Sequence, residues 1–201
     1  MRLNCNINGS QYSLVVNSDK PLSVILRELI LPFAENSRCM GAECGNCIVL
    51  INGSAALSCL VPAFRLNGAS ILTFEGFQKT RFCHDIERAY ADIGNQPCPQ
   101  CYPSKTIIIE SILNKVDKEN QSRISGFRIG SGGHADLQSR QNESSANEQA
   151  ARSRSGTGNI SPELIAREME MSRCKCIELT DLEKIINLAY KYRSRRRARR
   201  S

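Results

Sequence analysis

The chain has 201 residues, of which 41% are hydrophobic and 23% charged, an ordinary balance for a globular protein. Its N-terminus has no apolar signal segment and no later run is long enough to cross a bilayer, so we expect a cytoplasmic protein without membrane contact. The net charge of +7 comes from positions 191–201, whose seven basic residues leave 20 basic and 20 acidic residues in the rest. A neutral body argues against a nucleic-acid-binding protein.

The first part of the chain predicts a small sheet with one helix. β-favouring residues and two Asn-Gly turn signals predict strands at residues 3–7, 12–16, 48–51, 55–58 and 70–74. Between the two predicted hairpins, apolar residues recur at helical spacing from Leu22 to Leu29 after Pro21, a residue suited to a first helical turn. This order of elements predicts a β-grasp-like domain over residues 1–77.

From Asp85 onward the pattern is helical. Apolar periodicity predicts helices around residues 86–93, 105–116, 162–171 and 182–192. Positions 117–161 are rich in Ser, Gly, Asn, Gln and Arg, and cannot supply a core, so a long disordered insertion is expected there. We therefore predict an all-helical domain over residues 78–192, followed by an arginine-rich tail at 193–201.

Four cysteines in the first domain have a specific spacing. Cys39, Cys44 and Cys47 lie on one predicted loop, and Cys59 follows the second hairpin. The Cys-x4-Cys-x2-Cys pattern is typical of plant-type 2Fe-2S sites. A four-cysteine structural zinc is the alternative, although such sites more often use two short knuckles. We refer to these four residues as the N-terminal cysteine set.

A second group consists of two cysteine pairs in the helical part. Cys98 and Cys101 precede one predicted helix, and Cys174 and Cys176 precede another. Helix N-termini favour anions, so both positions suit metal-bound thiolates. Taken alone, the two pairs fit an iron-sulfur cluster, a zinc site or a redox dithiol. We refer to these four residues as the cysteine tetrad.

Of the remaining cysteines, Cys5 is expected to be a small buried residue. Cys83 lies beside His84, but a single Cys-His dipeptide is only weak evidence of a ligand pair.

Both cysteine groups together resemble the small iron-sulfur subunit of the molybdenum hydroxylases, the family of xanthine dehydrogenase and carbon monoxide dehydrogenase. The resemblance covers residues 1 to about 116 and 160 to 192. Besides the cysteines, the residues that carry it are Leu26–Glu28, Ser58–Leu60, Glu75-Gly76 and His84. The chain differs from the family at Pro97, which occupies the position of a glutamine that contacts the pterin in the family.

The resemblance implies an α+β protein with a β-grasp, plant-type ferredoxin-like domain followed by a four-helix 2Fe-2S-binding domain. It implies one 2Fe-2S cluster on Cys39, Cys44, Cys47 and Cys59, and a second on Cys98, Cys101, Cys174 and Cys176. Electrons would pass from a molybdopterin-binding large subunit through the second and then the first cluster to an FAD-binding medium subunit. The chain itself would hold no catalytic residue and no substrate site.

Two other functions are compatible with the residues. The first is a zinc-stapled nucleic-acid-binding module that uses the basic C-terminal residues. The second is a paralogue of the iron-sulfur subunit that holds one cluster. Metal analysis and the number of reduced-state spin signals distinguish these functions from the leading one.

Overall fold

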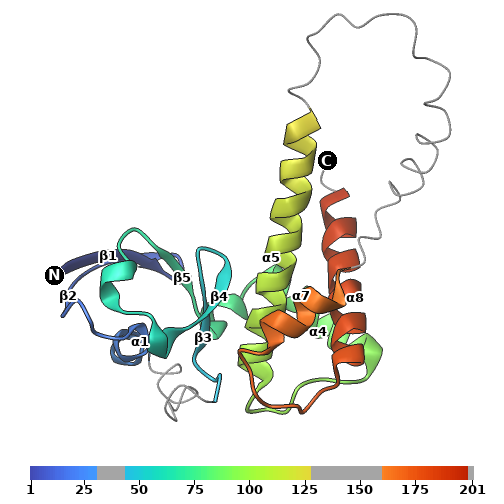
Figure 1. The fold of residues 1–201 in the computed structure, drawn as a ribbon, viewed down its shortest axis with the longest axis horizontal. Helices are drawn as coiled ribbons and strands as arrows, with labels where there is room; N and C mark the ends of the chain where they lie inside the picture. The colour runs from blue at the N-terminus through green and yellow to red at the C-terminus, as the bar shows by residue number, and fades with distance from the viewer. Residues whose placement is uncertain (31–43, 128–159, 199–201) are drawn as a thin grey trace, which may run out of the picture. The chain divides into compact units, whose positions relative to one another are not determined.

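The computed structural model describes residues 1–30, 44–127 and 160–198 (Figure 1). The strands are β1 (Arg2–Ile7), β2 (Ser10–Val15), β3 (Ile48–Ile51), β4 (Ser54–Leu57) and β5 (Ser70–Leu72). The helices are α1 (Leu22–Leu29), α3 (Phe74–Phe77), α4 (Arg81–Ile93), α5 (Tyr102–Phe127), α7 (Pro162–Met169) and α8 (Leu179–Ala198), with 3-10 turns η1 (Ser58–Leu60) and η2 (Ala63–Arg65). None of the described helices is long and apolar enough to cross a membrane.

The sheet has five strands in the order β2-β1-β5-β3-β4. β1 runs parallel to β5, and the other neighbouring pairs are antiparallel. Asn8 and Asn52 have φ of 52°, and the glycines after them have φ of 89° and 83°. Positive φ at both central residues is the type I′ geometry that suits a two-residue hairpin, which explains why Asn-Gly marks both turns. The predicted mixed α+β class and both predicted hairpins are confirmed.

Strand β3 is buried on both faces. Val49 packs with α1 and the inner residues of β1, whereas Ile48 and Leu50 pack with the helices that follow the sheet. Successive side chains of a strand point to opposite faces, so one strand can serve two cores in this way. Further contacts join the β3-β4 hairpin to α5: Ser111 accepts a hydrogen bond from the Ala55 N–H of β4 at 2.9 Å, and Asn114 donates to the carbonyl of Gly53 in the turn at 3.2 Å.

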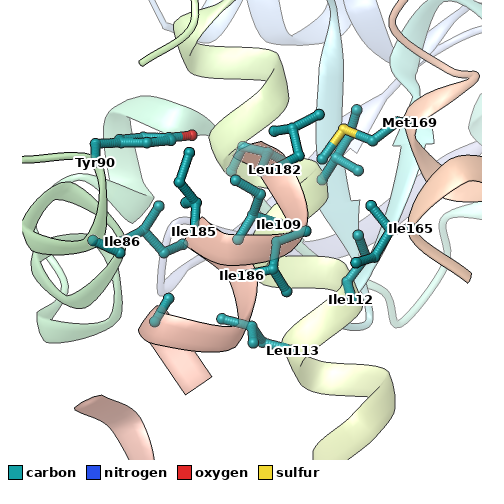
Figure 2. Packing of buried hydrophobic residues seen from close by; sticks show 14 of the residues in the cluster. Ile86, Tyr90, Ile109, Ile112, Leu113, Ile165, Met169, Leu182, Ile185 and Ile186 are labelled. Carbon is teal, nitrogen blue, oxygen red and sulfur yellow. The ribbon is translucent and has the colours of Figure 1, made fainter. Parts of the chain in front are cut away.

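The helices share one apolar core, shown in Figure 2. Its labelled residues come from four helices: Ile86, Tyr90, Ile109, Ile112, Leu113, Ile165, Met169, Leu182, Ile185 and Ile186. Backbone contacts place the sheet and these helices in one compact unit, Met1–Val116 with Ile160–Ser201, and place Asp117–Asn159 in another. The predicted division into domains at 1–77 and 78–192 stays a prediction.

Several boundaries differ from those predicted; α4, for example, begins at Arg81 rather than at Ile86. The residues from Asp117 to Phe127 belong to α5, so the segment predicted as an insertion from 117 begins as helix, and 128–159 lie outside the described residues. Phe74, predicted to end a strand, begins α3, where Phe77 fills a buried position. The last helix was predicted to end at Tyr192 and continues to Ala198.

The extension of α8 has a specific cause in its contacts. Arg193 is 1% exposed and forms an ion pair with Glu110 of α5. Its guanidinium also lies 4.5 Å from the ring centroid of Phe82, and Arg196 pairs with Asp85 of α4 at 2.7 Å. The first arginines of the predicted tail are therefore part of the folded core, because their counter-charges lie on other helices.

Replacing Arg193 with methionine should destabilise the protein by about 3 to 5 kcal/mol, since it leaves the Glu110 carboxylate buried without its cation. The matched control is Arg195→Met, an exposed arginine on the same helix, for which a change within about 0.5 kcal/mol is expected. Urea unfolding followed by circular dichroism measures both. Equal unfolding midpoints for the two variants would show that the buried pair does not stabilise α8.

Candidate metal centre

The structure brings the cysteine tetrad together. The sulfur atoms of Cys98, Cys101, Cys174 and Cys176 all lie within 4.8 Å of one another. They come from two connections that lie far apart in the sequence, one leading into α5 and the other into α8. Cys101 is buried, Cys98 and Cys174 are half-buried, and Cys176 is exposed, so the tetrad lies at the surface of the helical part.

Backbone hydrogen bonds form the turn that presents Cys98 and Cys101. The N–H groups of Cys101 and Tyr102 both donate to the Cys98 carbonyl at 2.9 Å. The Ser104 hydroxyl donates to the Cys101 carbonyl at 3.0 Å. This turn leads directly into α5, so the positive end of a long helix lies beside the two sulfurs.

Hydrogen bonds also reach the sulfur atoms themselves. The Cys98 N–H donates to the Cys176 sulfur at 3.4 Å, which ties the two connections to each other. A backbone hydrogen bond from Cys101, together with its thiol, lowers the pKa of Cys98 to about 7. Burial raises the pKa of Cys101, and it also raises the pKa of Cys176. The protein thus favours thiolate at the more accessible sulfur of the Cys98-Cys101 pair.

Four thiols this close suit a metal. Thiolates select zinc, copper(I) and iron-sulfur clusters over hard cations. Four mutually close thiolates without a metal would repel one another, whereas a bound metal or cluster compensates their charges. The donor set therefore fits an iron-sulfur cluster, and it also fits a tetrahedral zinc.

The N-terminal cysteine set is described in part, because Cys39 lies outside the described residues. Cys47 is buried immediately before β3, and Cys59 lies in η1 immediately after β4. The Ser58 hydroxyl and N–H donate to the Cys47 carbonyl at 2.7 Å and 3.1 Å, so the β3-β4 hairpin holds Cys47 and Cys59 at neighbouring positions. Cys59 was predicted to follow the second hairpin, and it lies in this 3-10 turn. Cys44 is half-buried on the loop before Cys47. The complete four-sulfur arrangement stays a prediction.

The loops that carry the two cysteine groups are in contact. Gly45, between Cys44 and Cys47, has φ of 71° and packs against the backbone of Met171 and Ser172, just before Cys174. A Cβ at Gly45 would lie 2.9 Å from the Ser172 Cα and closer still to the Met171 carbonyl oxygen. The sequence gives no local signal of this contact, because it joins residues more than a hundred positions apart.

The two remaining cysteines are structural. Cys5 lies in β1 and is buried, as expected from the sequence. Cys83 is fully buried on α4, and its sulfur lies 3.6 Å from a Glu87 carboxylate oxygen. Burial, together with the Glu87 charge, raises the pKa of Cys83 to about 12. His84 points instead to solvent and pairs with Glu87 at 2.9 Å, so Cys83 and His84 do not form a ligand pair.

Comparisons with known proteins identify the class of this protein. The xanthine dehydrogenase iron-sulfur-binding subunit of Escherichia coli O157:H7 is 35% identical over 132 residues, which are 66% of this chain and 82% of that protein. The nicotinate dehydrogenase small FeS subunit of Eubacterium barkeri is 27% identical over 113 residues, which are 56% of this chain and 72% of that protein. No family model matches the chain.

Solved structures agree on the fold. The aldehyde oxidoreductase of Desulfovibrio gigas aligns with a TM-score of 0.64 and 18% identity over 98% of this chain, which spans only 17% of that protein. Quinoline 2-oxidoreductase of Pseudomonas putida 86 aligns with a TM-score of 0.60 and 19% identity over 97% of this chain and 96% of the matched chain.

These findings define an iron-sulfur protein that serves as a non-catalytic subunit of an oxidoreductase. The chain belongs to the family of iron-sulfur small subunits of molybdenum hydroxylases, as its cysteine spacing predicts.

Replacing Gly45 with alanine should destabilise the protein more than the same change at Gly68. Both glycines have φ near 70°, which costs a non-glycine residue about 1 to 2 kcal/mol, but the space around Gly68 is open whereas Gly45 abuts Met171 and Ser172. Denaturant unfolding and bound-iron content measure the difference. If both variants lose the same stability and retain the same iron, the contact between the two loops does not matter.

Proposed function

We propose that this chain is a two-cluster electron-transfer subunit that relays electrons from a molybdopterin-binding subunit to an FAD-binding subunit. Cys98, Cys101, Cys174 and Cys176 would hold one 2Fe-2S cluster, and Cys39, Cys44, Cys47 and Cys59 the other. The single observation that carries this proposal is the convergence of the tetrad sulfurs to within 4.8 Å in a chain related to iron-sulfur subunits. The complex would act in the cytoplasm.

In this proposal each 2Fe-2S cluster supplies a site that takes up and releases one electron at a time. The chain's own residues hold the sulfurs and limit their contact with water. Cys101 is buried under the start of α5, and the Cys98 N–H donates to the Cys176 sulfur. Hydrogen bonds to thiolate sulfur stabilise negative charge, and thus favour the reduced state of the site.

The contact at Gly45 supports a relay between the two cysteine groups. Gly45 lies between two proposed ligands of the N-terminal set, and Met171 and Ser172 lie three and two residues before the proposed ligand Cys174. This packing gives a covalent and van der Waals route from one loop to the other without an intervening water layer.

A zinc-stapled binding module is the second candidate, and the spacing of the tetrad favours it in one respect. Four thiolates around one zinc at about 2.3 Å lie about 3.8 Å apart, which the tetrad can reach with little movement. A two-iron cluster divides its thiolates between two metals and needs a wider arrangement. The basic tail gives this candidate less support, because Arg193 and Arg196 are engaged within the fold. The related proteins favour iron.

Anaerobic purification tests the proposal. About four iron and four sulfide ions per chain are expected, with two distinguishable spin signals after reduction. Cys98→Ser should remove one of the signals and leave the other, because it takes away one ligand of one cluster. Cys5→Ala is the control and should retain both, since Cys5 packs in the sheet core. Stoichiometric zinc without iron would refute the proposal and favour the second candidate, and one signal in the unaltered protein would indicate a single-cluster paralogue.

A further inference from the structure

A buried lysine lies one helical turn beyond the cysteine tetrad. Lys105 is 2% exposed, and its backbone N–H donates to the Cys101 carbonyl at 2.9 Å. Residues four apart share a face of a helix, and long side chains on a helix point back toward its N-terminus. Lys105 therefore lies one helical turn after Cys101, on the side of α5 at which Cys101 precedes the helix.

The ammonium group has no partner among the residues that the structure describes: it forms neither a hydrogen bond nor an ion pair with them. Lysine is almost never fully buried without a compensating charge, because removing an ammonium ion from water is costly. An unpaired lysine at this position indicates that a negative charge belongs beside it.

The surroundings of Lys105 show where that charge belongs. Lys105 and Cys174 line the same cavity of about 610 Å³. Ser172 lines it as well, and its buried hydroxyl oxygen has no hydrogen-bond partner within the described part of the chain. The cavity also has basic residues, Arg173 and Lys175, and two exposed carboxylates, Glu170 and Glu178. Neither carboxylate is within ion-pair distance of Lys105, and Cys174 is the tetrad residue that lines this cavity together with it.

We propose that Lys105 is the internal counter-charge of the centre held by Cys98, Cys101, Cys174 and Cys176, and that it raises the reduction potential of that centre. This inference rests on the proposed function. Reduction adds one electron to the centre and neither adds nor removes an atom, so the site gains one negative charge. A fixed cation nearby stabilises the more negative state, and burial weakens the screening of that interaction by water and salt. Lys105 thus makes the centre a better electron acceptor.

The test is a redox titration of the purified iron-loaded chain, with dithionite as reductant and the spin signal that Cys98→Ser removes as readout. Lys105→Met should lower the midpoint potential of that signal by at least about 59 mV, a tenfold change in the ratio of reduced to oxidised centre for a one-electron couple. The other signal should keep its potential. Lys105→Arg retains the charge and should stay close to the unaltered protein.

Lys175→Met is the matched control. Lys175 lies between Cys174 and Cys176 in the sequence but is exposed, so water and salt screen its charge and the potential should shift much less. Should Lys105→Met fail to fold, Lys105→Gln removes the charge and keeps a polar group. If the charge-removing variant keeps the tetrad signal at an unchanged potential, the inference is wrong. If the unaltered protein shows no such signal, the proposed function fails instead, so the two failures are distinguishable.

Discussion

The burial of β3 on both faces is the constraint on which the arrangement of both cysteine groups depends. Val49 belongs to the core under α1, and Ile48 and Leu50 belong to the core of the helices. Cys47 directly precedes this strand, so its position is determined from two sides. Because both cores pack on this short strand, it links the position of the sheet to the position of the helices. A small, metal-binding protein gains from such sharing, because neither part alone buries much apolar surface.

The same sharing explains why Gly45 lies against Met171 and Ser172. The loop before β3 must approach the segment between α7 and α8 once both cores are packed, and a side chain at Gly45 would prevent that approach. The segment after α7 then continues to Cys174 and Cys176, which meet Cys98 and Cys101 at the start of α5. Packing that begins with three apolar residues of β3 thus extends to Cys47 and to the sulfur atoms of the tetrad.

Local signals explain which parts of the fold could be predicted from the sequence. Both Asn-Gly turns, the helix after Pro21 and the α+β class follow from short-range patterns, and the cysteine spacing is specific enough to indicate the family. The end of α8 could not be predicted, because its arginines look like a solvated tail until Glu110 and Asp85 are placed beside them. The polar residues 117–127 likewise gave no apolar period, although α5 continues through them.

The candidate metal centre shows the same division between local and distant information. The two cysteine pairs were predicted as cluster ligands from the resemblance to the iron-sulfur subunits, because their spacing alone also fits zinc or a redox dithiol. The burial of Lys105 was not predicted, because a lysine in an otherwise apolar helix is normally expected to face solvent. Only the packing of α5 against the segment before α8 shows that this lysine and Cys174 line one cavity.

Lys105 also bears on the choice between iron and zinc. A tetrathiolate zinc and a tetrathiolate iron-sulfur cluster are both anionic, so a buried ammonium would stabilise the bound form of either one. Zinc keeps a constant charge, since it has no redox chemistry in proteins, and beside it Lys105 would affect only the stability of the site. Beside a cluster that gains an electron, the same ammonium also determines how strongly that electron is held. A buried charge next to the tetrad therefore has a functional consequence for a redox centre that it cannot have for a structural metal.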